Sequence, residues 1–293
     1  MPYLREHTGA RENAEWLENV VKEFCLESAD NSLKNPESEK AWDKPLVGFS
    51  SGNDPLYQKL KEDIGPFYLT PLEIFQKSFP SVPVASAADL TVISWILPQT
   101  KATRTDNRKE TVHPSDRWAR SRYYGEIFNG ILRSHVCRVL QDKGIEAVAP
   151  MEAPFWTRVT SERYGFASNW SERHAAFVSG LGTFGLCDGL ITAVGKAVRC
   201  GSVIARITVT PTERPYSGHR EYCLFFTKGK CNKCIERCPA GAVSEAGHDK
   251  NKCQDYLNKM AEYVKEKLGF ETHPCGLCQT GVPCEFRIPG AGR

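Results

Sequence analysis

The chain has 293 residues, of which 41% are hydrophobic and 25% are charged, and its formal net charge is +3. These values exclude a disordered chain and leave enough apolar residues for one large or two modest folded domains. The charge is too small to favour nucleic acid binding, and no apolar run approaches the roughly 20 residues of a membrane span. The first residues show no export signal, so we expect a cytoplasmic protein without a membrane partner, whose twelve cysteines bind metal more readily than they form disulfides.

Helical and strand patterns alternate loosely over the first 210 residues. Apolar spacing predicts helices over 10–27, 119–143 and 171–179, and a proline with a capping-box glutamate predicts a helix start at Thr70. Runs of β-branched and aromatic residues predict strands over 90–97, 145–149 and 203–209. A polar loop is expected over 28–44. The alternation indicates a layered fold of the α/β or α+β class.

The cysteines are concentrated toward the end of the chain, because eight of the twelve fall between positions 223 and 284. A turn-rich stretch over 211–218 precedes them. We therefore predict two domains, one over 1–215 and a smaller cysteine-rich one over 216–293.

The spacing of these eight cysteines predicts two 4Fe-4S clusters, each held by four thiolates. In two-cluster ferredoxins the cysteine that precedes proline serves the other cluster, so Cys238 is expected to join a different set from its neighbours in the run. Lys228 stands where a bacterial run would place the remaining ligand, and Cys223 is the obvious substitute. The predicted sets are Cys238, Cys253, Cys275 and Cys278, and Cys223, Cys231, Cys234 and Cys284.

Two zinc sites with four cysteines each are the alternative, although the Cys-Pro punctuation and the interleaved order favour clusters. The remaining cysteines, Cys25, Cys137, Cys187 and Cys200, are expected to be small buried side chains. Cys187 and Cys200 flank a glycine-rich segment and are the first to examine as further ligands.

The middle of the chain resembles two enzyme families. Residues 171–185, SERHAAFVSGLGTFG, resemble the E-R and A-G-L-G stretch of epoxyqueuosine reductases, and reductive dehalogenases carry a related stretch. The segments GLIT at 189–192 and GSV at 201–203, and Cys253 followed by QDYL, are also similar to these families. The resemblance covers roughly 90–284. It implies a nitroreductase-like domain that binds base-off cobalamin, followed by a small ferredoxin-like domain whose two clusters relay electrons to cobalt.

The resemblance also implies a cofactor site. Its glycines would let the backbone approach a large flat ligand, with aromatic side chains beside it. From the residues alone, glycines that serve only the turns between a helix and two strands are the favoured alternative. The predicted cofactor-binding residues are Trp170, Arg173, Gly180, Gly182, Phe184, Gly185, Gly189, Gly201 and Ser202.

Two departures from the epoxyqueuosine reductases bear on the substrate. Their aspartate proton donor lies six residues before the E-R pair, where this chain has Phe166, and their tRNA-contacting tail is not seen after Cys284. Epoxyqueuosine in tRNA is therefore not the expected substrate. Tyr164 is the nearest replacement acid, because reductive dehalogenases use a tyrosine, although an ordinary half-buried aromatic is an equal alternative. Glu172, His174 and Glu152 are the further candidates.

The functional prediction is a cobalamin-dependent reductase that removes a leaving group from a small molecule by C–O or C–halogen chemistry. A low-potential donor of the ferredoxin or flavodoxin type would supply the electrons. The basic segment 101–122 is either a solvated face or a contact for an anionic substrate or the cofactor phosphate, with RNA as a third option that no motif supports. The alternative function is a two-cluster electron carrier or reductive activator without corrinoid, against which the long preceding domain argues.

Overall fold

The computed structural model describes residues 9–84 and 86–290. Its centre is a four-stranded sheet with the order β1-β2-β8-β3, in which every neighbouring pair is antiparallel. The strands are β1 (Leu46–Ser51), β2 (Thr91–Pro98), β8 (Val198–Ala205) and β3 (Ala147–Val148). β2 is buried along its whole length because it lies between two strands and under helices on both faces. The mixed helix and sheet architecture predicted from the sequence is confirmed.

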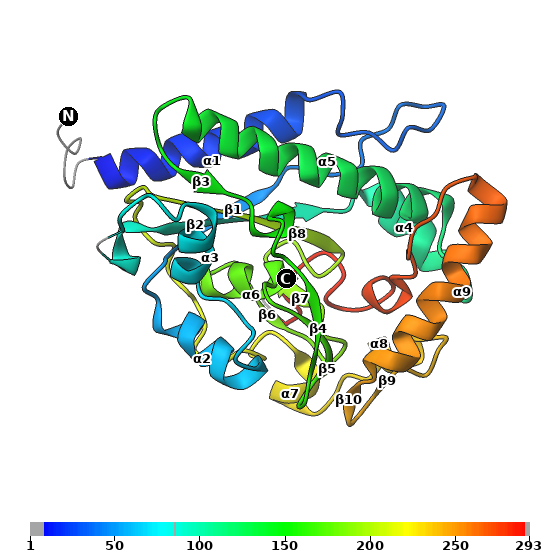
Figure 1. Cartoon of the computed structure of the whole chain (residues 1–293). Coiled ribbons are helices and arrows are strands. Elements are labelled where there is room, and N and C mark those ends of the chain that lie inside the picture. Colours follow the sequence, from blue (N-terminus) through cyan, green and yellow to red (C-terminus); the bar gives the residue numbers. More distant parts are fainter. Residues whose placement is uncertain (1–8, 85, 291–293) are drawn as a thin grey trace.

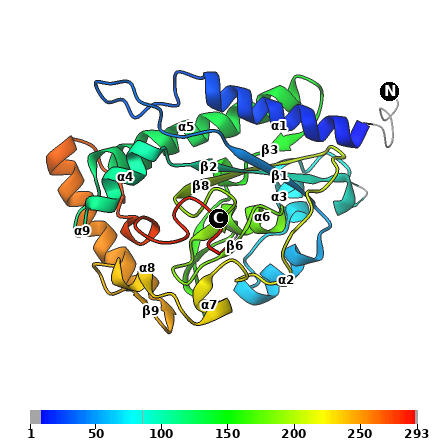
Figure 2. The same ribbon diagram turned by 180° about the vertical axis from the view of Figure 1, so that it is seen from behind.

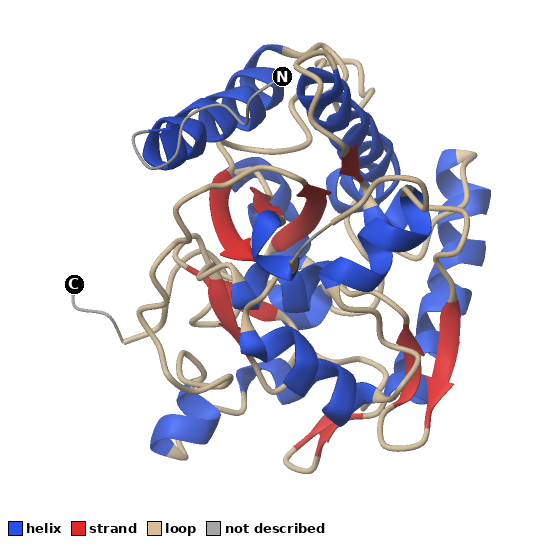
Figure 3. Ribbon diagram, turned by 60° about the vertical axis from the view of Figure 1, so that its left-hand side comes forward, coloured by secondary structure: helices blue, strands red, loops and turns tan. Residues whose placement is uncertain are grey.

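Helices cover both faces of this sheet (Figure 1). On one face, α1 (Gly9–Glu27) and the long α5 (Asp116–Gln141) pack against β1, β2 and β8, and their apolar side chains form one core cluster. On the other face lie α2 (Pro55–Ile64), α3 (Pro71–Ser78) and α6 (Glu172–Val178), which contribute to a second core cluster. The view from behind shows the same two layers (Figure 2), and Figure 3 shows the helices arranged around the central strands.

Several predicted elements occur as expected. The helix over 10–27 is α1, the strand over 90–97 is β2, and the helix over 119–143 is α5, which begins three residues earlier because Ser115 caps it. The capping box at Thr70 forms, with the Thr70 hydroxyl accepting from the Glu73 N–H and the Glu73 carboxylate accepting from the Thr70 N–H at 2.8 Å.

One strand is displaced from its predicted position. The strand expected over 203–209 is β8, which runs from Val198 to Ala205 and pairs with the whole of β2. Its first half includes Gly201, which lies opposite Trp95 and could not carry a side chain, since a Cβ there would lie 2.4 Å from the indole ring. The ring of Trp95 thus fills the space that a side chain at position 201 would need. The chain therefore has a glycine there in place of a β-branched residue, and the sequence pattern did not indicate a strand.

Short elements connect the layers. They comprise α4 (Lys101–Lys109), the hairpin of β4 (Arg158–Ser161) and β5 (Gly165–Ser168), and the hairpin of β6 (Gly182–Phe184) and β7 (Leu190–Thr192). Three single turns of 3-10 helix complete the set, η1 (Ala87–Asp89), η2 (Pro150–Glu152) and η3 (Leu277–Gln279).

The cysteine-rich segment contains α7 (Leu224–Lys228), α8 (Lys233–Glu236), the small hairpin of β9 (Val243–Ser244) and β10 (Gly247–His248), and α9 (Lys250–Leu268). It folds back against the rest of the chain, and α9 stands beside the first turns of α5 (Figure 1). Arg237 donates to the carbonyl oxygens of Asn107 and Glu110, and the buried carboxylate of Glu285 pairs with Arg108 at 2.6 Å. Among the helices of residues 9–84 and 86–290, none combines the length and apolar character needed to cross a bilayer.

Candidate functional site

The first predicted cysteine set lines one small pocket. Cys223, Cys231, Cys234 and Cys284 all face a space of about 350 Å³ whose other walls are mainly apolar. These cysteines come from the start of α7, from the turn before α8, from α8 itself and from the segment after η3. The chain therefore brings together the four residues that the spacing predicted as one ligand set, including the substitute Cys223.

The second predicted set lies on the wall of a much larger cleft. Cys238, Cys253, Cys275 and Cys278 all line this cleft, which holds about 1520 Å³ of empty space that is partly open to solvent. Gly276, between two of these cysteines, has φ +73° and a Cβ there would lie 2.2 Å from the ring of Trp118. The glycine is thus required for the turn to pack closely on α5.

In the part of the chain that the structure describes, no three His, Cys, Asp or Glu side chains are close enough together to hold a single metal ion. A cluster of four irons spreads its four thiolates more widely than one ion does, so each set is matched in number and chemistry to a cluster. The assignment of individual cysteines as ligands stays a prediction.

Lys196 lies between the two sets and lines both spaces. It is 2% exposed, and its Nζ donates to the Sγ of Cys187 at 3.2 Å. Burial alone would lower the pKa of Lys196, but the negative potential of the thiols around it, at Cys187, Cys284, Cys278 and Cys234, holds the pKa well above its ordinary value. No carboxylate of the described residues pairs with this ammonium group. Its charge is therefore matched only if the sulfur groups around it are anionic, as cluster-bound thiolates are.

Cys187 is a ninth cysteine at the same place. It is 6% exposed, and hydrogen bonds with the thiols of Cys234 and Cys278, one from each set, lower its pKa well below the ordinary value. The sequence offered one signal for it, its position at the edge of the glycine-rich segment. Cys200, the other flanking cysteine, is a buried residue of β8 on the cleft wall, and burial raises its pKa to about 12.

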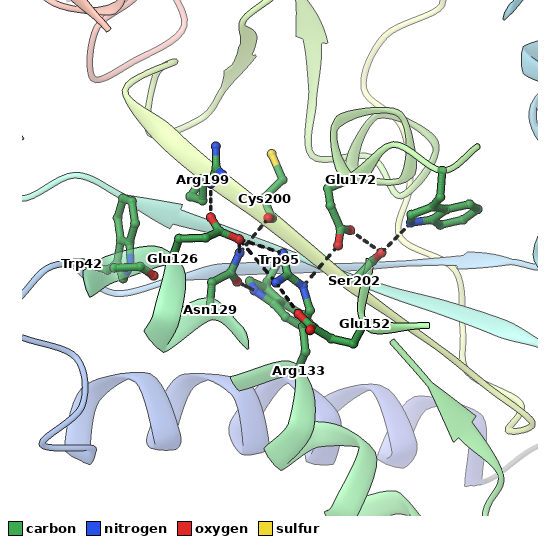
Figure 4. Close-up of polar contacts among 12 residues, drawn as sticks. Trp42, Trp95, Glu126, Asn129, Arg133, Glu152, Glu172, Arg199, Cys200 and Ser202 are labelled. Carbon is green, nitrogen blue, oxygen red and sulfur yellow. Dashed lines mark hydrogen bonds and ion pairs between the residues drawn. The ribbon is translucent and has the colours of Figure 1, made fainter. Parts of the chain in front are cut away.

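The opposite wall of the cleft is formed by α5. Trp118, Arg122, Glu126 and Arg133 all line the cleft, because their spacing places them on one face of the helix. Arg133 is buried and is surrounded by three carboxylates, with distances of 3.4 Å to Glu126, 3.1 Å to Glu152 and 3.2 Å to Glu172 (Figure 4). Arg199, from β8, pairs with the second oxygen of Glu126.

Glu172 is the predicted catalytic residue that this network brings to the cleft. It begins α6, its Oε1 accepts from Arg133, and its Oε2 accepts from the hydroxyl of Ser202. Ser202 in turn accepts from the indole N–H of Trp170 at 3.1 Å. Burial raises the pKa of Glu172 above its ordinary value, although Arg133 and the Ser202 hydroxyl oppose the shift. A carboxyl group with this surrounding can hold a proton closer to neutral pH than an exposed one.

The other two predicted catalytic residues do not line the cleft. Tyr164 lies in the turn of the β4–β5 hairpin, is 37% exposed, and its hydroxyl donates to Asp63 at 2.6 Å. Burial and the Asp63 carboxylate raise the pKa of Tyr164 to about 12. His174 points away from the cleft, between the rings of Tyr68 and Phe184. Burial, with the charge of Arg173, lowers the pKa of His174 to about 3, so it is neutral.

Some of the predicted cofactor-binding residues line the cleft or the small pocket, and others pack inside the fold. Trp170, Arg173 and Gly189 line the large cleft, and Gly185 lines the small pocket. Gly180, Gly182 and Gly201 instead meet other parts of the chain, since a Cβ on them would lie 2.7 Å from Glu213, 2.2 Å from Ile191 and 2.4 Å from Trp95. These three positions need glycine for close packing, a role that neither the cofactor prediction nor the alternative of turn glycines described. Phe184 packs against Phe177 and His174, away from the cleft.

Comparison with known proteins places these features in context. No protein-family model matches the chain. An epoxyqueuosine reductase from Bacillus anthracis is 30% identical over 119 residues, which are 39% of this chain and 29% of that protein. An epoxyqueuosine reductase from Atelocyanobacterium thalassa is 27% identical over 181 residues, or 57% of this chain and 52% of that protein. The chain thus spans between about a third and a half of these relatives.

Among solved structures, a tagged variant of the catabolic reductive dehalogenase NpRdhA matches 96% of this chain and 38% of its own, with a TM-score of 0.51 at 15% sequence identity. This match concerns the fold alone. The resemblance read from the residues is confirmed: the chain is similar in sequence to epoxyqueuosine reductases, and its fold is similar to that of a reductive dehalogenase.

Proposed function

We propose that this protein is an iron–sulfur reductase that binds two 4Fe-4S clusters at its two cysteine sets and cobalamin in the adjoining cleft. The observation that carries the proposal is the position of the second cysteine set on the wall of that cleft, with the first set behind it across Lys196. Electrons from a ferredoxin- or flavodoxin-type donor would enter at one set and leave toward the cleft at the other.

The residues of the cleft suit a large ligand that accepts hydrogen bonds. The indole N–H groups of Trp118 and Trp156 are buried without a partner in the described chain, and both side chains line the cleft. Such donors need an acceptor, which the amide groups and phosphate of cobalamin offer. When bound, cobalamin would supply the reductive cleavage of a carbon–oxygen or carbon–halogen bond.

In the proposed reaction the substrate takes up two electrons and one proton, and the leaving group departs as an anion. The proton has to come from the protein or from water. Of the four residues predicted as candidate acids, Tyr164, Glu172, His174 and Glu152, only Glu172 lines the cleft, and its raised pKa supports a role in holding the proton at its carboxyl group. Arg133 and Ser202 would orient that carboxyl group through the hydrogen bonds that they donate to its two oxygens.

The substrate and domain assignments belong to the same proposal. We infer a nitroreductase-like domain over 1–215 and a ferredoxin-like domain over 216–293. Phe166 stands at the position of the aspartate expected in the epoxyqueuosine reductases, which supports a small-molecule substrate other than epoxyqueuosine in tRNA.

Anaerobic reconstitution tests the proposal directly. We expect close to eight iron and eight sulfide per chain, with four ligands to each cluster. Added cobalamin should then co-elute with the protein and change its absorption spectrum. Stoichiometric zinc without sulfide would refute the clusters. Full cluster content without any cobalamin binding would refute the cofactor and favour the two-cluster electron carrier.

A variant pair tests the acid. Glu172→Gln should keep both clusters and lower substrate turnover by roughly 100-fold or more, the contribution typical of a positioned acid. Tyr164→Phe serves as the matched control, because it removes a hydroxyl that is bound to Asp63 outside the cleft. A loss in Tyr164→Phe alone would return the role to the tyrosine, and equal losses in both variants would refute the assignment of the acid to Glu172 alone.

A further inference from the structure

The cleft has an excess of positive charge. Its lining includes five arginine or lysine side chains, Arg122, Arg133, Arg173, Lys196 and Arg199, but only two carboxylates, Glu126 and Glu172. Arg133 is matched by three acidic residues, and Lys196 faces the cysteine sets. The excess therefore resides on the remaining arginines.

Two of these arginines have no carboxylate partner within residues 9–84 and 86–290. Arg122 makes no hydrogen bond or ion pair there, because both oxygens of its neighbour Glu126 are already taken by Arg199 and Arg133. Arg173 donates only to the carbonyl oxygen of Asp188, which leaves its charge unmatched. Burial and the neighbouring Arg199 lower the pKa of Arg122 to about 9, so the guanidinium is still charged at neutral pH but is held at a cost.

The neutral groups around Arg122 point to the same kind of ligand. Trp118 lies one turn before Arg122 on α5 and is 1% exposed, and its buried indole N–H has no partner in the described part of the chain. The unmatched N–H of Trp156 faces the same cleft. The Arg122 guanidinium and these two indole N–H groups are all hydrogen-bond donors without an acceptor in the described part of the chain. A ligand that fits them must present oxygen acceptors and negative charge.

We propose that Arg122, with Arg173, binds an oxyanion in this cleft, a carboxylate or phosphate carried either by the substrate or by the cofactor. This inference deepens the proposed function, since it concerns the ligand of the same cleft. A planar guanidinium presents paired N–H groups that match a carboxylate or phosphate, and Arg122 has these groups unengaged. Binding would also relieve the repulsion between Arg122 and Arg199.

Calorimetric titration of the anaerobically reconstituted protein, before any cobalamin is added, tests the oxyanion itself. The probes are inorganic phosphate, benzoate and the neutral analogue benzamide, at constant ionic strength. Phosphate or benzoate should bind and benzamide should not. Arg122→Gln should weaken that binding roughly 10- to 100-fold, the range expected for the loss of a charge-assisted hydrogen bond. Arg122→Lys keeps the charge but lacks the paired N–H groups of a guanidinium. Its affinity for the anion should lie between the affinities of the unaltered protein and of Arg122→Gln.

Arg138→Gln is the matched control, because Arg138 is an exposed residue of the same helix that does not line the cleft. Circular dichroism and iron content establish that each variant is folded and loaded. Equal anion affinity in Arg122→Gln and Arg138→Gln would overturn the proposal, as would equal binding of benzamide and benzoate to the unaltered protein.

A second titration separates the two sources of the oxyanion. Cobalamin carries a phosphate in its nucleotide tail and cobinamide lacks it. If the cofactor supplies the oxyanion, Arg122→Gln weakens cobalamin binding but spares cobinamide, and phosphate competes with cobalamin. If the substrate supplies it, both corrinoids bind Arg122→Gln normally and benzoate still binds the cobalamin-loaded protein. Anion binding with no corrinoid binding would refute the proposed cofactor while supporting the oxyanion site.

Discussion

Replacement of Lys196 by methionine gives a sensitive test of the arrangement of the two cysteine sets. Methionine keeps the length and apolar stem of the side chain and removes only the ammonium group, which is buried and lies 3.2 Å from the Sγ of Cys187. The charge also acts on the thiols of Cys234, Cys278 and Cys284, so it faces members of both sets. An electron added to either of the proposed clusters would be stabilised by this positive charge.

The size of the effect follows from Coulomb's law. At an effective dielectric constant of about 20, a unit charge about 6 Å from the added electron contributes about 3 kcal/mol to a one-electron reduction. Since about 1.4 kcal/mol corresponds to about 59 mV for one electron, Lys196→Met should lower the reduction potentials of the clusters by about 125 mV.

The assay is a redox titration followed by electron paramagnetic resonance, which reports each cluster without any substrate. Lys228→Met is the control, because Lys228 lies on α7 near the first set but is exposed, so solvent screens its charge. It should move the potentials by less than about 20 mV, a small fraction of the buried effect. Unchanged or raised potentials in Lys196→Met, with full iron content, would refute the placement of this charge between the clusters.

The remaining predictions concern ligation, stability and pH. Cys223→Ser should abolish one cluster, so that iron analysis finds about four iron per chain. The control Cys137→Ser, which lies outside both cysteine sets, should keep about eight iron per chain. Full iron content in Cys223→Ser would transfer the ligand role to Cys187. Arg133→Met leaves three carboxylates without their buried partner and should lower the free energy of unfolding by about 3–5 kcal/mol, measured by urea denaturation; a loss below about 1 kcal/mol would mean that the ion network is dispensable. His174 has a folded pKa of about 3, below its unfolded value, so its contribution to stability is full above about pH 6.5 and falls by about 1.4 kcal/mol per pH unit on acidification. Between pH 7 and pH 5, the free energy of unfolding of His174→Phe should therefore fall by about 2 kcal/mol less than that of the unaltered protein. Identical falls for the two proteins in denaturation curves would contradict a buried neutral histidine.

The sequence predicted those elements whose signals are local. Helix α5 has a long apolar repeat and a serine cap, and the helix at Thr70 has a capping box, so neighbouring residues alone determine where each begins. β8 was displaced because its first half depends on a partner: Gly201 is a strand residue only because Trp95 of β2 fills the space beside it. No window of the sequence around Gly201 contains that information.

In the candidate site, too, the residues with a local sequence signal could be predicted and the others could not. Cysteine spacing is a local signal, and the two predicted sets do line two distinct spaces. Lys196 has no such signature, since a lysine is normally a surface residue and only the surrounding thiols explain its burial. The position of Tyr164 also depends on a distant partner. Its sequence distance from the E-R pair is short, but the β4–β5 hairpin turns its hydroxyl to Asp63, away from the cleft.

The backbone bonds between the segment before β8 and the end of the cysteine-rich segment have a consequence for biosynthesis. The N–H groups of Lys196 and Ala197 donate to the carbonyl oxygens of Cys284 and Glu285, and Glu285 is buried against Arg108. Cys284 follows the other seven predicted ligands in the sequence, so the first set cannot close until the chain has been made at least as far as Cys284. We therefore expect that a nascent chain arrested before Cys284 would carry at most one cluster, the one predicted at the second set, whose ligands all precede Cys284.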